Sequence, residues 1–257
     1  QLQSEYLNYA ETLLRNDVPV IFDVRHLSLL LGLDAFYLNS IIFGNPCHYR
    51  QYEIPKHSGG TRTITAPYPE LKHVQQWIYE NILASVKVHR CAHGFKRNKS
   101  ILTNAQIHVK NRCLLKIDLK DFFPSIKKDR VICVFRQLGY TDEVALALAS
   151  ICCLDDCLPQ GAPTSPCLSN IISRQLDNRL YELAKSMNLR YTRYADDIAF
   201  SGNKIPAILI DYVESIIKEC GFEINNNKVR LYGENGNKIL TGISLRDNRL
   251  RLPREKR

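Results

Sequence analysis

Three aspartates at the ends of β-prone segments are the residues of this chain best suited to bind divalent cations. Asp196 and Asp197 lie at the tip of a predicted β-hairpin formed by residues 190–201, and Asp118 follows the apolar run 113–117, which predicts a buried strand. An Asp-Asp pair is also common as a solvated turn, but adjacent carboxylates repel each other unless a cation neutralises them. Two hard cations about 3.5–4 Å apart bind the attacking and leaving oxygens in phosphoryl transfer, and carboxylate oxygens are their preferred ligands.

A loop of small residues at 158–166 precedes a helical pattern. Ser165 is the predicted N-cap and Pro166 the first helical residue. The apolar residues that follow at helical spacing are Leu168, Ile171, Ile172, Leu176, Leu180 and Leu183. Gly161 permits close approach of its backbone to a base pair or nucleotide. We therefore predict a loop that contacts a nucleotide and a helix that packs in the core.

The order of these segments resembles motifs A to D of reverse transcriptases, which would lie at residues 118–126, 158–166, 194–197 and 221–228. The chain is also similar to the retron branch of that family. Residues 104–108 match its Asn-Ala-x-x-His signature, and Leu240-Thr241-Gly242 is close to its Val-Thr-Gly element. The resemblance covers nearly the whole chain.

The resemblance implies an α+β fold, a right-hand polymerase with fingers and palm and with the thumb absent or truncated. The expected domains are N-terminal helices and fingers at 1–112, the motif A strand of the palm at 113–128, a fingers insertion at 129–157, the rest of the palm at 158–235, and a motif E-like region with the start of a thumb at 236–257. Strand and helix patterns alternate without repeats or linkers, which agrees with such a fold.

Local patterns predict several further elements. Residues 4–15 and 26–43 have the apolar spacing of two helices, and residues 52–65 that of a β-hairpin with an exposed Gly-Gly tip. A helix that begins at Pro69 and another at 206–220, ended by Gly221, complete the set.

The resemblance implies RNA-directed DNA synthesis with two Mg²⁺ ions. It assigns Asp118 and Asp196 as bridging ligands, Asp197 as a third carboxylate, and the carbonyl of Leu119 as an additional ligand. Lys228, at the motif D position, would donate a proton or positive charge to the leaving pyrophosphate.

The resemblance also implies a set of nucleotide-binding residues. Lys56 and Arg62 flank the hairpin tip, where basic residues of the family fold over the triphosphate, although an exposed arginine is equally compatible with plain surface charge. Phe123 takes the position beneath the sugar, where a ring would exclude a 2′-hydroxyl; a core phenylalanine is the alternative. Gln160 and Gly161 match positions that contact the templating pair or the nucleotide.

The charge distribution favours a polyanionic partner. Lys and Arg total 35 against 26 acidic residues, for a net charge of +9, and residues 81–117 contain no Asp or Glu. A phosphate track is the favoured interpretation of that segment, and a solvated basic face is the alternative. The RNA-binding candidates are Lys99, Asn104, His108, Lys110 and Arg112. Asn104 and His108 would otherwise brace the fingers against the palm.

Cysteine usage and hydropathy indicate a reducing, cytoplasmic environment without membrane association. Nine cysteines occur with no signal peptide and no run of 18 apolar residues. Cys152, Cys153 and Cys157 cluster without a second Cys or His pair at zinc-like spacing. We expect reduced thiols and no zinc site.

We therefore expect a retron-type reverse transcriptase that copies a structured non-coding RNA into single-stranded DNA covalently linked to RNA. Its expected partners are that RNA, its DNA copy, dNTPs and an effector protein in phage defence. The alternatives are a group II intron-like or other bacterial defence reverse transcriptase, an RNA-directed RNA polymerase, which commonly carries Gly-Asp-Asp, and a catalytically silent RNA-binding subunit. Nucleotide incorporation on a primed RNA template separates these classes.

Overall fold

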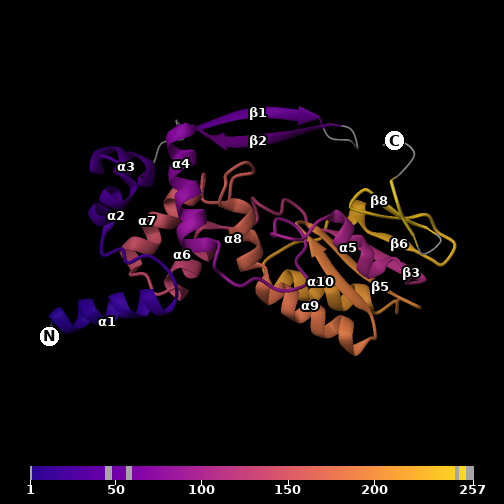
Figure 1. Ribbon diagram of the computed structural model, residues 1–257. Coiled ribbons are helices and arrows are strands. Elements are labelled where there is room, and N and C mark those ends of the chain that lie inside the picture. Colours follow the sequence, from indigo (N-terminus) through magenta and orange to yellow (C-terminus); the bar gives the residue numbers. More distant parts are fainter. Residues whose placement is uncertain (1, 44–47, 56–59, 247–248, 253–257) are drawn as a thin grey trace. The chain divides into compact units, whose positions relative to one another are not determined.

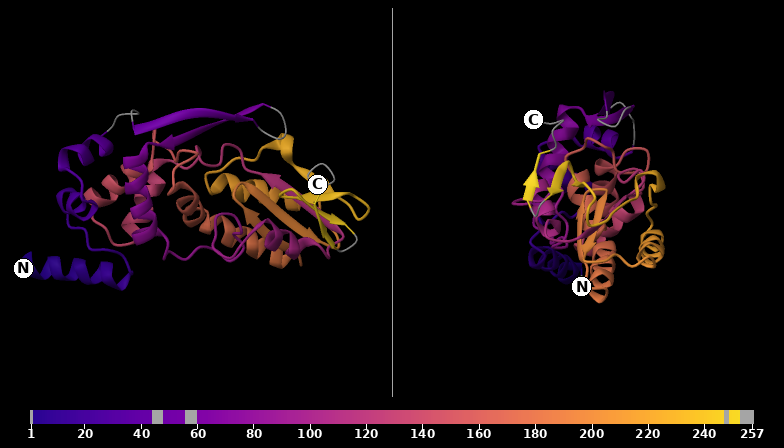
Figure 2. Two further views of the ribbon diagram at one scale, coloured as in Figure 1. Left: turned by 45° about the horizontal axis from the view of Figure 1, so that its top comes forward. Right: turned by 90° about the vertical axis from the view of Figure 1, so that its right-hand side faces the viewer.

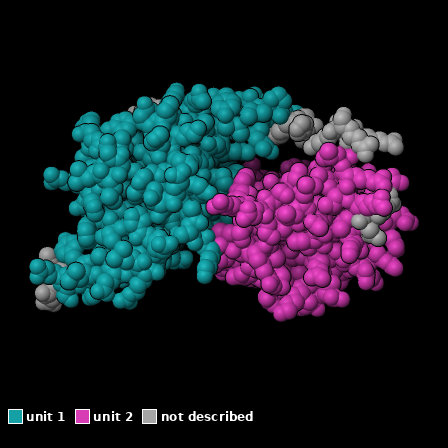
Figure 3. All heavy atoms as spheres, in the orientation of Figure 1, with its two compact units in different colours: residues 1–87, 123–172 teal, residues 88–122, 173–257 magenta. Residues whose placement is uncertain are grey.

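The computed structural model describes the chain as two compact units. The described residues are 2–43, 48–55, 60–246 and 249–252. Unit 1 comprises residues 1–87 and 123–172, and unit 2 comprises residues 88–122 and 173–257 (Figure 3). Each unit combines two stretches of chain that are far apart in sequence, so each depends on long-range packing.

Unit 1 is mostly helical and is built around one apolar helix. Its helices are α1 (Leu2–Arg15), α2 (Val24–Leu31), α3 (Ala35–Ile42), α4 (Pro69–Ile78) with a following π-helical turn (Tyr79–Leu83), α6 (Lys128–Gln137), α7 (Asp142–Cys152) and α8 (Ser165–Ile172) (Figure 1). The side chain of Thr141 caps α7 by accepting a hydrogen bond from Val144 N. Buried residues occupy most of the circumference of α7, which contacts α2, α3, α4 and α6. It therefore forms the core of unit 1.

A long β-hairpin completes unit 1 and confirms the hairpin expected at 52–65. Its strands are β1 (Tyr49–Pro55) and β2 (Thr61–Pro67), with Tyr49 opposite Pro67 and Pro55 opposite Thr61. Most of β1 is exposed. The residues at the tip, 56–59, including Lys56, lie outside the described residues.

Unit 2 contains a four-stranded antiparallel sheet. Its strands are β3 (Cys113–Asp118), β4 (Arg190–Tyr194), β5 (Asp197–Gly202) and β6 (Arg230–Tyr232), in the order β4-β5-β3-β6. The strand that ends at Asp118 and the hairpin at 190–201 are both confirmed, although the tip consists of Ala195 and Asp196 and Asp197 is already the first residue of β5. The two central strands, β3 and β5, are buried along most of their length, so both faces of the sheet are covered.

Helices and a second sheet cover the two faces. The covering elements are α5 (Ile101–His108), α9 (Arg174–Ser186), α10 (Leu209–Glu219), a 3-10 turn (Asn226–Lys228) and the three-stranded sheet β7 (Lys238–Leu240), β8 (Ile243–Arg246) and β9 (Arg249–Arg251) (Figure 1 and Figure 2). On β4, Tyr191 bonds to α9 while Thr192 bonds to α5. Because successive residues of a strand face opposite sides, α9 and α5 lie on opposite faces. Ala105 of α5 shares one apolar cluster with Ala199 of β5 and Leu240 of β7.

The single helix predicted for residues 26–43 is wrong, because the structure has two. Gly32 ends α2 with a left-handed backbone (φ 65°), and the Asp34 side chain caps α3 by accepting hydrogen bonds from Phe36 N and Tyr37 N. Apolar spacing continues through this short break, so periodicity alone did not reveal it.

A similar break separates α8 from α9. Ser173 adopts φ −75° and ψ 0°, and the boundary between the two units falls at the same place. The predicted N-cap of α8 is also wrong. Leu168 N bonds to Thr164 O, which makes Thr164 the capping residue, whereas the Ser165 hydroxyl donates to Pro159 O.

The compact units divide the chain at positions other than the expected domain bounds. Residues 88–112 belong to unit 2, where α5 packs on β4, and residues 158–172 belong to unit 1. Among the described helices, none combines the length and apolarity needed to cross a bilayer. No disulfide joins the cysteines within the described ranges.

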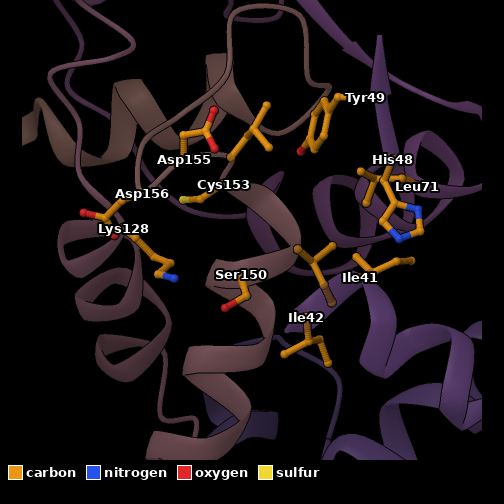
Figure 4. Close-up of a pocket in the computed structure, with 12 residues that line it drawn as sticks. Ile41, Ile42, His48, Tyr49, Leu71, Lys128, Ser150, Cys153, Asp155 and Asp156 are labelled. Carbon is orange, nitrogen blue, oxygen red and sulfur yellow. The ribbon is translucent and has the colours of Figure 1, made fainter. Parts of the chain in front are cut away.

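Unit 1 also has a small, partly open pocket of about 130 Å³ (Figure 4). Its lining includes Tyr49, Lys128, Cys153 and the neighbouring Asp155 and Asp156. Burial raises the pKa of the Tyr49 hydroxyl, which accepts a hydrogen bond from Gln75 Nε2. None of the described lining residues is a predicted site residue, so the pocket is separate from the chemistry expected for this chain.

Candidate active site

The predicted carboxylates meet at one end of the sheet of unit 2. Strand β3 ends at Asp118 where β5 begins at Asp197, and these two residues are direct partners in the antiparallel register. Leu119 N donates to Asp196 O over 3.0 Å, which ties the turn to the strand end. Cross-strand partners have closely spaced side chains, so the 78-residue gap in sequence between Asp118 and Asp196 is closed by strand pairing.

Two lysines neutralise part of this acidic cluster. Lys228 Nζ lies 2.9 and 3.0 Å from the two carboxylate oxygens of Asp118, which is almost fully buried. Asn225 adds two bonds to the same residue, from its backbone N to Asp118 O and from Nδ2 to Oδ1. Lys116 Nζ lies 3.0 Å from Asp197 Oδ1 as an ion pair. Of the three carboxylates, Asp196 has no such lysine partner among the ion pairs of the described residues.

Burial and mutual repulsion raise the pKa values of the two aspartates at the turn, Asp196 and Asp197. Burial raises the pKa of Asp196 to about 6, and the charges of Asp197 and Asp118 act in the same direction. Burial also raises the pKa of Asp197, although Lys116 opposes that shift. Partial burial disfavours the charged form of Lys228, but the hydrogen bond and charge of Asp118 outweigh it and raise its pKa. The cluster therefore favours additional positive charge.

The turn that presents Asp196 has a strained backbone. Tyr194 and Asp197 are paired, so Ala195 and Asp196 form a two-residue turn. Ala195 has φ +55°, a region that disfavours residues with a side chain. Gly94 packs directly on this turn, because a Cβ added there would lie 2.6 Å from Ala195 N. The turn is thus held by close backbone contact from a distant loop.

Comparison with known proteins shows the family of this chain. Residues 54–241 match the family model described as reverse transcriptase (RNA-dependent DNA polymerase). The chain belongs to the reverse transcriptase family. The chain is therefore an RNA-directed DNA polymerase, and the matched range contains β3, β4 and β5 with all three carboxylates.

The similar proteins place this reverse transcriptase in the retron branch. The chain is 36% identical to the retron Ec86 reverse transcriptase of Escherichia coli, over 98% of this chain and 80% of that protein. It is 36% identical to the retron Mx162 reverse transcriptase of Myxococcus xanthus, over 89% of this chain and 54% of that protein. The fold also resembles telomerase from Candida albicans, with a TM-score of 0.53 and 11% identity over 76% of this chain and 45% of that one. The expected right-hand polymerase core is therefore confirmed.

Reverse transcriptase domains generally use divalent metal ions, and the chemistry of this cluster fits them. Asp118, Asp196 and Asp197 supply hard oxygen donors, and burial, with the neighbouring charges of Asp197 and Asp118, raises the pKa of Asp196. Within the described ranges, no group of three or more His, Cys, Asp or Glu side chains is arranged to hold a metal ion. Lys228 and Lys116 contact two of the three carboxylates, so ion binding requires rearrangement of these side chains.

Apart from Lys228 in unit 2, the nucleotide-binding candidates of this reverse transcriptase fall in unit 1. Arg62 is exposed on β2, opposite Ile54. Phe123 is half-buried, and its carbonyl accepts a hydrogen bond from Ile126 N. Gln160 O accepts a hydrogen bond from Thr65 N over 2.8 Å. A Cβ on Gly161 (φ +140°) would lie 2.7 Å from Thr65 O, so its close backbone approach is to strand β2 of the protein itself.

The RNA-binding candidates fall into two groups. Asn104 and His108 are each 1% exposed. Both side chains bond to Thr192 of β4, and His108 also bonds to Ser201 of β5. This burial favours a bracing role over RNA contact, since the bonds fix α5 to β4 and β5, the two strands that flank the Ala195-Asp196 turn.

The second group lies nearer the surface. Lys110 and Arg112 are exposed and Lys99 is half-buried. Arg112 pairs with Glu234 at 3.4 Å between two exposed side chains, an interaction of little energetic weight. These residues remain available for the phosphate attraction predicted from the basic segment.

Sequence reasoning missed several residues that support the site. Gly94, Lys116 and Asn225 contact the turn or the carboxylates, and Arg193 and Asp177 form a buried ion pair behind the turn. The only sequence signal for the buried pair was that Arg193 and Asp177 stand within apolar patterns, because charged residues are rarely buried unless paired.

Proposed function

We propose that the chain copies part of a structured non-coding RNA into single-stranded DNA that stays covalently linked to RNA, by nucleotidyl transfer with two Mg²⁺ ions. The observation that carries this proposal is the pairing of Asp118 with Asp197 directly beside a third carboxylate, Asp196. The retron relatives support the choice of template and product class. Magnesium suits the site because all three side chains offer carboxylate oxygens and none offers sulfur or imidazole.

In this proposal Asp118 and Asp196 hold both ions, Asp197 assists, and the carbonyl of Leu119 completes the set. When bound, the ions would polarise the α-phosphate and lower the pKa of the primer hydroxyl. Lys228 balances the charge of Asp118 in the structure. Its side chain is 55% exposed, and on release from Asp118 it would turn toward the leaving pyrophosphate, where its charge would stabilise the departing oxygens.

Unit 1 supplies nucleotide selection in this proposal. Arg62, on the exposed β2, would contact the triphosphate, and Lys56 would assist it. The ring of Phe123 would lie beneath the sugar and exclude a 2′-hydroxyl. Gln160 and Gly161 would present their backbone to the templating pair, with the loop held in place by the bond from Thr65 N to Gln160 O.

RNA recognition in this proposal combines charge with a fixed scaffold. Lys99, Lys110 and Arg112 would attract phosphates, which gives affinity without sequence selection. Asn104 and His108 would act from the interior by holding α5 on the sheet. Structured RNA is recognised mainly by shape and unstacked bases, which a rigid surface can distinguish.

We further propose a cytoplasmic role in phage defence, together with an effector protein. The similarity to retron reverse transcriptases supports this role. Purification of the chain from phage-challenged cells, with and without its RNA, would reveal a co-purifying protein if the proposal is correct.

The central test is to sequence the RNA and DNA that co-purify with the chain and to measure dNTP incorporation on that RNA. We expect one enriched RNA species, DNA complementary to part of it, and DNA that loses its RNA only after ribonuclease treatment. Incorporation on any primed RNA without an enriched species would indicate a general reverse transcriptase. RNA binding without incorporation would indicate a silent RNA-binding subunit.

A further inference from the structure

Strand β4 sends side chains into buried polar networks on both faces of the sheet. Thr192 faces α5, whereas Tyr191 and Arg193 face α9. Arg193 is the largest fully buried side chain among the described residues. Its Nε and Nη2 donate to the two carboxylate oxygens of Asp177, over 2.8 and 2.7 Å, and Asp177 is itself fully buried. This two-point geometry fixes the plane of the guanidinium.

The third nitrogen of Arg193 reaches the catalytic turn. Nη1 donates to the carbonyl oxygen of Ala195 over 3.1 Å. Ala195 is the residue with positive φ, and Asp196 follows it directly. The carbonyls of Arg193 and Asp196 are held by other elements, since His93 N donates to Arg193 O and Leu119 N donates to Asp196 O. Arg193 therefore supplies the bond to the Ala195 carbonyl.

A buried ion pair adds little net stability to a fold, because desolvation of the two charges offsets most of their attraction. Apolar side chains of similar volume would serve packing equally well. What they cannot supply is a planar donor that binds Asp177 and a backbone carbonyl at once. The Arg193–Asp177 pair is thus better explained by geometry than by stability.

We propose that Arg193 is a positioning residue for catalysis. By binding Asp177 of α9 and the Ala195 carbonyl at once, it fixes the turn relative to α9 and so orients the Asp196 carboxylate for the metal ions. This inference rests on the proposed two-metal chemistry. Small displacements of a catalytic group are costly, since an error of about 1 Å can reduce turnover about a hundredfold.

The test compares Arg193→Lys with Tyr191→Phe. Lysine keeps the charge but loses the fork that joins Asp177 to Ala195. Tyr191 donates to the same Asp177 oxygen over 2.7 Å and has no bond to the turn, so Tyr191→Phe is the matched control for a weakened network. Primer extension gives kcat and the KM for dNTP, and electron paramagnetic resonance gives the affinity of the protein alone for Mn²⁺, which shares the oxygen preference of Mg²⁺.

We expect Arg193→Lys to lower kcat about 10- to 100-fold and to weaken Mn²⁺ binding, with the KM for dNTP and the RNA affinity changed less than about threefold. Tyr191→Phe should keep kcat and Mn²⁺ affinity within about threefold of wild type. An equal loss in both variants, or none in a folded Arg193→Lys, overturns the positioning role. Wild-type protein that fails to extend any primer overturns the proposed function instead.

A double variant separates loss of positioning from misfolding of Arg193→Lys. Arg193→Gln combined with Asp177→Asn removes both buried charges, which relieves the desolvation cost, and also removes the bond to Ala195. We expect this double variant to fold with a melting temperature near that of wild type and still to lose kcat and Mn²⁺ affinity. Wild-type kcat in the double variant contradicts the proposal.

Discussion

The chain contains two turns with adjacent aspartates, one in each unit, and they have opposite surroundings. Asp155 and Asp156 form the turn between Leu154 and Cys157 in unit 1, both with positive φ and both exposed. They line the small pocket of that unit (Figure 4). Asp196 and Asp197 in unit 2 are half-buried, and burial raises the pKa of both.

The difference lies in what surrounds each dipeptide rather than in the dipeptide itself. Short polar residues favour turns because they tolerate left-handed backbone and bond locally, which accounts for Asp155 and Asp156. The turn in unit 2 instead has a third carboxylate at the end of the neighbouring strand and two lysines beside it. An Asp-Asp pair is suited to bind a cation only where packing brings further negative charge beside it.

The largest expected effect comes from removing one carboxylate from each turn. Asp196→Asn should reduce primer extension about a thousandfold or more, because a neutral amide is a poor ligand for Mg²⁺. Asp156→Asn, the matched change in the exposed turn, should leave extension within about twofold of wild type. RNA binding by both variants, measured by filter retention, should be unchanged. Retained extension by Asp196→Asn would contradict the metal-site assignment.

The packing around the Ala195-Asp196 turn can be altered without changing a carboxylate. Gly94→Ala places a Cβ against the backbone nitrogen of Ala195, so we expect the turn to shift and kcat to fall about a hundredfold. Gly233, where a Cβ meets nothing within 4 Å, provides the matched control as Gly233→Ala. Single-turnover extension kinetics measure both variants. An unchanged kcat for Gly94→Ala would show that the turn yields to the added methyl group without loss of alignment.

A substitution at Phe123 in unit 1 should change the selectivity for dNTP over rNTP rather than the rate of the chemical step. If the Phe123 ring excludes a 2′-hydroxyl, Phe123→Val should raise ribonucleotide incorporation relative to deoxynucleotide incorporation about tenfold or more. Competition between dNTP and rNTP on one template measures this ratio, and thermal unfolding measures stability. Lower stability with an unchanged ratio would assign the ring to the core of unit 1.

The smallest effect concerns the bracing of the hairpin by His108. Burial lowers the pKa of His108 from 6.5 to about 3, so the folded state keeps it neutral while the unfolded chain gains a proton below pH 6.5. Stability should therefore fall as pH drops from about 6.5 toward 3, by up to about 1.4 kcal/mol per pH unit for this group. The free energy of unfolding at pH 7 and pH 5 tests this. His108→Gln should lose less stability between those values than wild type, and equal losses would exclude His108 as the source.

Local patterns in the sequence predicted much of the fold. The apolar run before Asp118, the hairpin of β4 and β5, and the Pro69 start of α4 each follow from short-range periodicity and turn chemistry. The ordered motifs predicted the family and the three carboxylates. Such features are determined within a dozen residues, so the sequence alone suffices to recognise them.

The tertiary structure decided which polar groups meet. The bond from His108 to Thr192 spans 84 residues, and that from Lys228 to Asp118 spans 110. Asn104 and His108 looked like surface recognition residues because their helix lies in a basic segment, and only packing against β4 and β5 shows that they are buried. The bond from Arg193 to Asp177 spans only 16 residues, yet it depends on α9 packing on the sheet. Polar pairs of this kind leave no periodic pattern in the sequence, because they depend on which helix and sheet faces pack together. Once packed, a buried charge or donor without a partner costs free energy, so the groups that meet must pair.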